Sequence, residues 1–473
     1  MFGLVSACLM CLASTLLVVL AIPMVMMYLM LRSCLVVALR LKSGRNVLPL
    51  THCDRSFICQ LFPNCAREDC HECIFIFLKT HCPTRGVILN SLTKSYDKET
   101  WPTKFRSELK FFWRYAFWIE DPHFCLESHV EDFSGTMEDC LKTPHYHPSD
   151  SSNRWIFLIC TDGIVFRVHH ALMDAISSCK FIAATIIDKA GSSLEISPVP
   201  KHSASFWVYL FSFLNQNAHN IQHMWFDKNQ WMIPHPRSAK IIYAATKPFS
   251  TQRLKKICAI FGGATISELF VTAILTTIVS LTKDIENSKM SYFIAFAYHD
   301  LAQYKEIRVD HHLGNATSGY RIKVQPRKMS IVETLEDTQR NFRRFKTDPF
   351  RMCLRYWFET SNYYPWPTWL PVECPATTII SSVPGLNRRC KILGGNAIDE
   401  IRFHCNTQCS APPFIFHFIS YAESVTLTMS IDFKVLELSG CTAPEFLQLI
   451  SQNISELEKC SQDLNNFEKP IHE

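Results

Sequence analysis

The order of apolar and polar positions predicts a body that mixes strands and helices. Residues 155–160 and 164–170 are two runs rich in β-branched and aromatic side chains, joined by Thr161-Asp162-Gly163. Asp-Gly between two such runs is a strong signal for a β-hairpin. A helix should follow, because Asp174 can cap it and apolar residues recur at helical spacing from Ile176 to Ile187, with Gly191 as the stop.

The second half of the chain repeats this mixture. A helix over residues 266–281 should begin at a capping box formed by Thr265 and Glu268, and a final helix should begin at a second one formed by Thr442 and Glu445. Strands are expected at 291–297, 319–324 and 377–383, and a second hairpin at 414–421 and 425–432. The last strand alternates between apolar and polar residues, as a strand with one apolar face does.

These elements predict the α/β fold class, and the chain length suggests two or three domains. The first domain covers residues 45–200 and the second residues 246–462, with a hydrophobic linker over residues 201–245. The apolar run at 206–214 within this linker is too short to span a membrane. It fits either a buried helix that joins the domains or an interfacial segment that rests on a bilayer.

A membrane-length apolar segment precedes the body. Residues 1–31 carry no charge, and about 20 helical residues suffice to span the hydrocarbon of a bilayer. The positive charges, beginning with Arg32 and Arg40, follow the apolar run, whereas a signal peptide carries them before it. The pattern predicts one transmembrane helix, kinked at Pro23, with a cytosolic body.

Composition excludes several classes of function. The 473 residues are 48% hydrophobic and 19% charged, with a net charge of +5, which indicates a folded rather than a disordered chain. The Lys and Arg residues form no basic block, so no nucleic-acid partner is expected. Neither a G-x-G-x-x-G run nor a G-x-x-x-x-G-K-[ST] run is present, and this argues against a phosphate-cradling loop.

Cysteine usage agrees with a cytosolic body. The 21 cysteines are odd in number and dispersed, which favours free thiols over a disulfide framework. Cys70 and Cys73 have the spacing of a zinc half-site, but no second ligand pair accompanies them, so no metal is predicted. The sequons at Asn315 and Asn453 would carry glycans only if the body were lumenal.

The strongest candidate for chemistry is the pair His169 and His170 at the end of the first hairpin. Adjacent strand residues point to opposite faces, so at most one of the two rings can face a channel, and alternation alone does not choose between them. A histidine titrates near neutral pH and suits general-base catalysis. Asp174 could brace the loop that follows. A second doublet, His311-His312, has no assigned role.

At these residues the chain resembles a known family. The run from His169 to Ala175 is similar to the H-H-x-x-x-D-G motif of the wax-ester synthase / diacylglycerol acyltransferase family, within the chloramphenicol acetyltransferase-like superfamily of CoA-dependent acyltransferases. Further segments resemble other motifs of this family in the family's order, from residue 45 to residue 460: Pro49-Leu50-Thr51-His52-Cys53-Asp54, Trp118-Ile119-Glu120-Asp121-Pro122-His123-Phe124, His129-Val130, Leu313-Gly314-Asn315, Ser382-Val383-Pro384-Gly385 and Ser420-Tyr421.

The resemblance implies two chloramphenicol acetyltransferase-like domains that face a central tunnel. His170 would be the general base, with His169 as its neighbour and Asp174 as a structural residue of the catalytic loop. The same resemblance implies that Ser382, Pro384, Gly385 and Asn315 bind substrate. Acyl-CoA would be the cosubstrate, without any other cofactor, and the acceptor would be a long-chain alcohol or diacylglycerol, giving wax ester or triacylglycerol at the endoplasmic reticulum or plasma membrane.

Two departures from the family pattern keep alternatives open. Ala175 replaces the motif glycine, and Ser382 and Leu386 replace an asparagine and a proline of the later motif. A catalytically inactive, membrane-tethered lipid-binding protein with the same fold would tolerate both changes. A secreted, disulfide-bonded protein that has lost residues 1–31 is a third hypothesis. The aromatic segment 356–369 fits an apolar tunnel or a packed loop.

Overall fold

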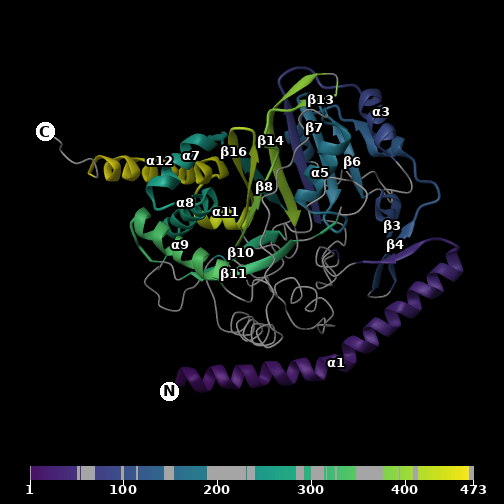
Figure 1. Cartoon of the computed structure of the whole chain (residues 1–473), viewed down its shortest axis with the longest axis horizontal. Helices are drawn as coiled ribbons and strands as arrows, with labels where there is room; N and C mark the ends of the chain where they lie inside the picture. The colour runs from purple at the N-terminus through teal and green to yellow at the C-terminus, as the bar shows by residue number, and fades with distance from the viewer. Residues whose placement is uncertain are drawn as a thin grey trace.

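A computed structural model shows two α/β halves, each built on its own large sheet (Figure 1). The structure describes residues 2–50, 54, 70–96, 101–112, 115–142, 154–188, 231, 240–283, 292–299, 314–315, 317–324, 327–347, 377–393, 395–407 and 414–467. Four expectations lie outside these residues: Gly191 as the helix stop, the apolar run 206–214, the doublet His311-His312 and the aromatic segment 356–369.

The N-terminal half is built on a six-stranded sheet in the order β13-β14-β2-β7-β6-β5. Its core faces α3 (Arg85–Ser95) and α5 (Ala175–Thr185), and α4 (Met137–Lys142) lies on the opposite face. The predicted hairpin is present, because β6 and β7 pair antiparallel around Asp162-Gly163. The strands are β2 (Cys70–Leu78), β5 (Val130–Asp132), β6 (Trp155–Ile159), β7 (Gly163–His169), β13 (Lys391–Ile392) and β14 (Asn396–Thr407).

Gly163 is required by close approach of two strands. A Cβ atom at this position would lie 2.3 Å from the carbonyl oxygen of Ile76 on the neighbouring strand β2. The Asp-Gly pair therefore serves the packing of the sheet as well as the turn.

The C-terminal half contains a seven-stranded sheet in the order β11-β10-β12-β15-β16-β8, with β9 paired to β16. One face packs on the helices, as the predicted alternation of the last strand requires. The strands are β8 (Ile241–Ala245), β9 (Phe249–Ser250), β10 (Tyr292–His299), β11 (Thr317–Val324), β12 (Thr378–Val383), β15 (Phe414–Tyr421) and β16 (Ser424–Asp432), and the helices are α7 (Thr251–Ile260), α8 (Ile266–Ser280), α9 (Ile331–Thr347), α11 (Phe433–Ser439) and α12 (Ala443–Phe467).

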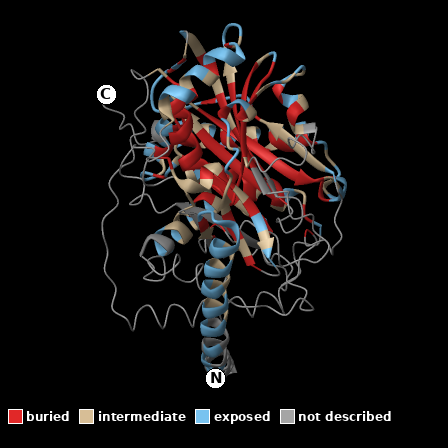
Figure 2. Ribbon diagram, turned by 90° about the vertical axis from the view of Figure 1, so that its right-hand side faces the viewer, coloured by how far each residue is buried: buried red, intermediate tan, exposed pale blue. Residues whose placement is uncertain are grey.

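Strand β14 joins the two halves. It pairs with β2 in the N-terminal sheet and packs against β15 and β16 of the C-terminal sheet (Figure 1). The hydroxyl of Thr428 on β16 donates to the carbonyl of Phe403 on β14 at 2.5 Å. Figure 2 shows that buried residues fill the interior of the body. β8, inside the segment 201–245 predicted as a linker, is a strand of the C-terminal sheet that pairs with β16.

The N-terminal helix α1 (Phe2–Ser43) is longer than the predicted anchor and contains Pro23. Its C-terminal part packs on a small sheet of β1 (Val47–Pro49), β4 (Tyr115–Glu120) and β3 (Ser107–Phe112), where Tyr28 stacks on Tyr115 with ring centroids 4.8 Å apart. Arg32 and Arg40, expected at a membrane edge, donate to the carbonyls of Leu50 and Val47. They therefore fix α1 to the body.

The rest of α1 extends away from the body (Figures 1 and 2). Several of its apolar side chains are exposed, among them Leu12, Leu16, Val19, Met26 and Met30. Across the part of the chain that the structure describes, no helix has both the length and the apolar content needed to cross a bilayer. The predicted transmembrane anchor over residues 1–31 is therefore not supported.

Both predicted capping boxes are confirmed, at the starts of α8 and α12. Helix α5 begins after Asp174 as predicted but ends at Thr185, well before Gly191. The helix is shorter because Ile187 forms a β-bridge with Ile392, next to β14. This contact, distant in sequence, draws the backbone out of the helix.

Candidate active site

His170 lies on the turn between β7 and α5, inside the joint between the two halves. Every residue of β7 is buried, and His170 itself is 8% exposed. Asp174 caps α5, because its Oδ1 accepts a hydrogen bond from the amide of Ser177 at 3.0 Å. The Ser177 hydroxyl and the Asp174 amide both donate to the carbonyl of Gly314. Asp174 thus sets the shape of the loop that carries His170.

His169 and His170 have different surroundings. The His169 side chain is fully buried, and its Nδ1 accepts a hydrogen bond from the amide of Ala171 at 3.1 Å. The ring of His169 is thereby used to shape the turn. His170 instead contacts a carboxylate from the neighbouring strand. The structure therefore distinguishes two histidines that alternation left equivalent.

That carboxylate belongs to Glu72 on β2, a residue that sequence reasoning missed. Nε2 of His170 lies 3.0 Å from Oε1 of Glu72, and the Glu72 side chain is 2% exposed. The hydroxyl of Ser178 lies 3.5 Å from its other oxygen. Burial raises the pKa of Glu72, while the nearby His170 lowers it in part. The sequence signal is one acidic residue near the start of a strand whose later residues, from Cys73 to Leu78, are apolar.

Asn315 forms a hydrogen bond with the backbone of the loop that carries His170. Its Nδ2 donates to the carbonyl oxygen of His170 at 2.8 Å and to Oδ1 of Asp54 at 2.9 Å. Asp54 is buried, and its Oδ1 lies 3.7 Å from Nζ of Lys104. Two segments singled out by the resemblance, the Pro-Leu-x-x-x-Asp segment and the Gly-Asn segment, therefore meet at the turn that carries the histidine.

The later segments meet at another point, on the C-terminal sheet. The amide of Gly385 donates to the hydroxyl of Ser420 at 3.1 Å, and a Cβ atom at Gly385 would lie 1.8 Å from the Ser420 carbonyl oxygen. Ser382 lies at the end of β12, with its hydroxyl 3.5 Å from that of Ser267. Pro384 and Gly385 follow in the loop, and no contact described for Ser382 or Gly385 reaches the His170 turn.

A buried histidine of the C-terminal sheet, His417, lies near this turn. His417 on β15 lies close enough to interact electrostatically with His170 and His404. Burial, together with these two histidines, holds the pKa of His417 well below its usual value, and burial lowers the pKa of His404 to about 3. Both rings are therefore neutral near neutral pH. The hydroxyl of Thr428 donates toward the carbonyl of His417 at 3.4 Å.

The departure at Ala175 causes no backbone strain. Ala175 is the first residue of α5 and is 2% exposed. Among the residues described, the only non-glycine residue with a positive φ is Ala422. The methyl group at position 175 is therefore compatible with the conformation of the loop.

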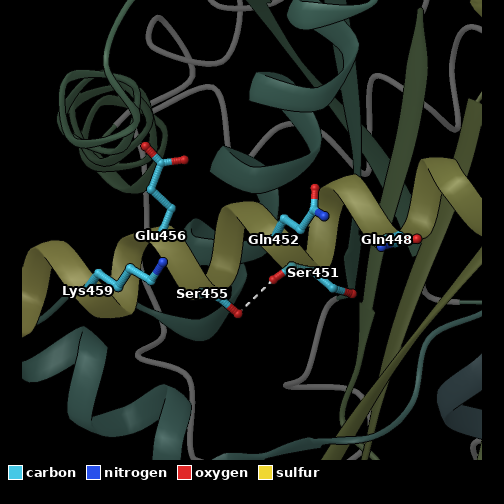
Figure 3. Close-up of a pocket in the computed structure, with 6 residues that line it drawn as sticks. All are labelled: Gln448, Ser451, Gln452, Ser455, Glu456 and Lys459. Atoms are coloured by element: carbon cyan, nitrogen blue, oxygen red, sulfur yellow. Dashed lines mark hydrogen bonds between the residues drawn. The ribbon is translucent and has the colours of Figure 1, made fainter.

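A surface depression lies elsewhere, along one side of α12 (Figure 3). It has a volume of about 570 Å³ and is lined by Gln448, Ser451, Gln452, Ser455, Glu456 and Lys459. All of these residues come from a single helix, so the depression is shallow and distinct from the His170 turn. Within the described ranges, no group of His, Cys, Asp and Glu side chains could hold a metal ion.

Comparison with known proteins supports the fold. No protein-family model matches the chain, and no curated protein matches it in sequence. Among solved structures, the wax ester synthase/diacylglycerol acyltransferase of Marinobacter aquaeolei VT8 is 14% identical, with a TM-score of 0.54 over 88% of this chain and 100% of that one. The trichothecene 15-O-acetyltransferase TRI3 of Fusarium sporotrichioides is 10% identical, with a TM-score of 0.59 over 88% and 94%.

A third similar structure is the starter condensation domain of rhizomide synthetase RzmA in complex with C8-CoA and Leu-SNAC. It is 10% identical, with a TM-score of 0.53 over 88% of this chain and 95% of that domain. At these identities the likeness shows the fold alone. The chain therefore has the two-domain α/β fold found in acyltransferases and condensation domains, as the motif resemblance predicts for the superfamily.

Proposed function

We propose that the chain is an O-acyltransferase that moves a fatty acyl group from acyl-CoA to a lipid hydroxyl. The observation that carries the proposal is the placement of His170. The turn that carries His170 is held by Asp174 and Asn315. His170 lies between the two halves, near the uncharged ring of His417. A buried imidazole held by its backbone is suited to act as a general base.

In the proposed reaction, His170 takes the proton of the acceptor hydroxyl as that oxygen attacks the thioester carbonyl. The tetrahedral intermediate then collapses, the carbon–sulfur bond breaks, and the imidazolium returns its proton to the leaving thiolate. Acyl-CoA is the cosubstrate, and this sequence of steps uses no further cofactor. Asn315 and Asp174 act on the loop, and we assign substrate contacts to Ser382, Pro384 and Gly385.

We further propose a long-chain alcohol or diacylglycerol as the acceptor, with wax ester or triacylglycerol as the product. Such acceptors partition into bilayers, and the exposed apolar side chains of α1 favour contact with a membrane surface of the endoplasmic reticulum or plasma membrane. The internal hydrogen bonds of Asn315 and Asn453 argue against glycans at both sequons. A cytosolic body is consistent with these bonds.

The test is ester formation by membranes that carry the full chain, supplied with labelled palmitoyl-CoA, hexadecanol and diacylglycerol. We expect His170→Ala to lower the rate by about 10²–10⁴-fold, the usual contribution of a general base. His81→Ala, which removes an exposed histidine, is the matched control and should keep the wild-type rate. The labelled product identifies the acceptor, and fractionation of the same preparation shows whether the chain sediments with membranes.

A different result would favour the inactive lipid-binding protein. If folded wild-type and His170→Ala chains both match empty membranes, acyl transfer is wrong. Retention of labelled lipid by both chains would then support binding without turnover.

A further inference from the structure

Glu72 stands out among the buried charged groups, because it is the one whose carboxylate contacts the ring of the proposed base. The Nε2–Oε1 separation of 3.0 Å is a hydrogen-bond distance, and both side chains are nearly inaccessible, at 10% exposed for His170 and 2% for Glu72. A buried carboxylate carries a large desolvation cost unless a partner offsets it. The position of Glu72 therefore needs an explanation beyond packing.

We propose that Glu72 is a positioning residue of the acyl-transfer site: it fixes the imidazole of His170 and balances the positive charge that the ring gains on taking the hydroxyl proton. This inference rests on the proposed function. Because Glu72 contacts His170 and not the reacting atoms, it acts through the histidine. The carboxylate is neither consumed nor altered, and the proton still passes from hydroxyl to imidazole to thiolate.

The fold places Glu72 on the correct face of the sheet. Glu72 pairs with Val168 on β7, so its side chain shares a face with Val168 and lies beneath α5. Ser178 on α5 reaches the second carboxylate oxygen. The carboxylate is thus held between a strand and a helix, both rigid elements, and this arrangement restricts the ring that it contacts.

The charge of Glu72 makes His170 a stronger base. An ionised Glu72 beside a neutral His170 carries one net negative charge, and uptake of a proton by the ring makes the pair neutral. Burial raises the pKa of Glu72, but His170 beside it lowers that pKa in part and so favours the ionised carboxylate. Burial also disfavours net charge on the pair, so it favours uptake of the proton by the ring. Without the carboxylate, uptake would create an isolated buried cation, and the histidine would be a weaker base.

Other titratable groups surround the pair and belong in any pH argument. Asp174, at the start of α5, raises the pKa of Glu72, and the burial of Cys179 on α5 raises its own pKa to about 12, so that this thiol stays neutral. Across the joint, His417 is neutral near neutral pH because its pKa is lowered. Two further neighbours among the described residues are Cys73 on β2, which interacts with Glu72, and Lys180 on α5, which interacts with Asp174.

The test compares Glu72→Gln, which keeps shape but removes charge, with Glu72→Asp, which keeps charge but shortens the side chain. We expect Glu72→Gln to lower kcat by about 10–10³-fold with KM for palmitoyl-CoA within about twofold, and to move the acidic limb of the pH–rate profile to lower pH by about one unit. Glu72→Asp should recover part of the lost kcat, and the acidic limb of its pH–rate profile should lie at the wild-type pH. Glu458→Gln, which removes the carboxylate paired with Arg253 on the surface of the C-terminal half, is the control and should change neither quantity.

A second measurement does not depend on activity. The imidazole of His170 can be titrated by NMR in full-length chains labelled at histidine, with His170→Gln used to assign its signal. We expect this titration to move to lower pH in Glu72→Gln. If the wild type transfers no acyl group yet the titration moves, the proposed function fails while the coupling of Glu72 and His170 stands.

A wild-type kcat and pH profile in folded Glu72→Gln would overturn the role of Glu72 and leave the acyltransferase proposal intact. If Glu72→Gln does not fold, Glu72→Asp decides the matter. If the aspartate variant has a lower kcat but an acidic limb at the wild-type pH, the result supports positioning of His170 by a charged partner. An unchanged kcat overturns it.

Discussion

Asn315 offers a direct test of how the His170 turn is held. The substitution Asn315→Ala removes two hydrogen bonds at once, one to the His170 carbonyl at 2.8 Å and one to Oδ1 of Asp54 at 2.9 Å. It leaves the main fold untouched, because neither bond belongs to a sheet or a helix. It should therefore loosen the turn without disrupting the core.

The size of the effect follows from the two acceptors. A hydrogen bond to a charged group contributes about 1.5–3 kcal/mol and one to a neutral carbonyl about 0.5–1.5 kcal/mol. Asp54 is 1% exposed but keeps Lys104 as an ionic neighbour at 3.7 Å, which offsets part of its loss. We expect the free energy of unfolding to fall by about 2 kcal/mol, taking the low end of the sum.

Urea unfolding gives the stability change, and ester formation gives the catalytic change. The matched control is Asn453→Ala, since Asn453 also donates two internal bonds, to the Ala273 carbonyl and to the Thr277 hydroxyl, but on α12. Asn453→Ala should lose about 1 kcal/mol, since both of its acceptors are neutral. Only Asn315→Ala should also lose activity, by about tenfold or more, because a general base must stay within hydrogen-bond reach of the proton that it abstracts.

The reasoning is refuted if Asn315→Ala keeps wild-type activity at a temperature where it is fully folded. It is refuted in its energetic part if the loss of stability is below about 0.5 kcal/mol, the range of ordinary surface substitutions.

Two further predictions concern stability. Gly385→Ala should destabilise the C-terminal sheet by about 1–3 kcal/mol in urea unfolding, because its Cβ would lie 1.8 Å from the Ser420 carbonyl oxygen; an unchanged urea midpoint would contradict this. Burial lowers the pKa of His129 from 6.5 to about 4, so the folded state binds fewer protons there than the unfolded chain. The contribution of His129 to the free energy of unfolding should be fully present above pH 6.5 and should fall by about 3 kcal/mol toward pH 4. The His129→Gln variant should therefore lose less stability than the wild type between pH 6.5 and pH 4 in urea unfolding, and an equal loss in both would contradict this.

Local signals predicted most of the secondary structure. Asp162-Gly163 and the capping boxes of Thr265 and Thr442 act over a few residues, and each begins or joins the expected element. The predicted end of α5 was wrong because Ile187 pairs with Ile392, a residue far along the chain. The pairing of β14 with β2 could not be predicted either, because nothing in the sequence of a strand specifies which sheet it joins.

The site was predictable only in part, for a related reason. The His-His-x-x-x-Asp run placed the histidine and the helix cap on one short loop, where spacing alone is informative. Glu72 could not be assigned, because its contact with His170 depends on the pairing of β2 with β7 in one particular register. A shift of that register by one residue would turn Glu72 to the opposite face of the sheet.

The two halves contribute unlike surfaces to the site, and this division suits the proposed chemistry. Glu72, Asp174 and Asp54 all lie on the N-terminal side, each tied to the turn that carries His170 or to the residues that hold it. The C-terminal side contributes His417, which is buried and uncharged near neutral pH. Surface groups without charge have a small desolvation free energy when an apolar acyl chain excludes water from them. Charged groups are needed only where a proton moves. In the proposed reaction, this separation would keep the proton transfer apart from the apolar acyl chain, so that no unbalanced charge would be buried beside that chain.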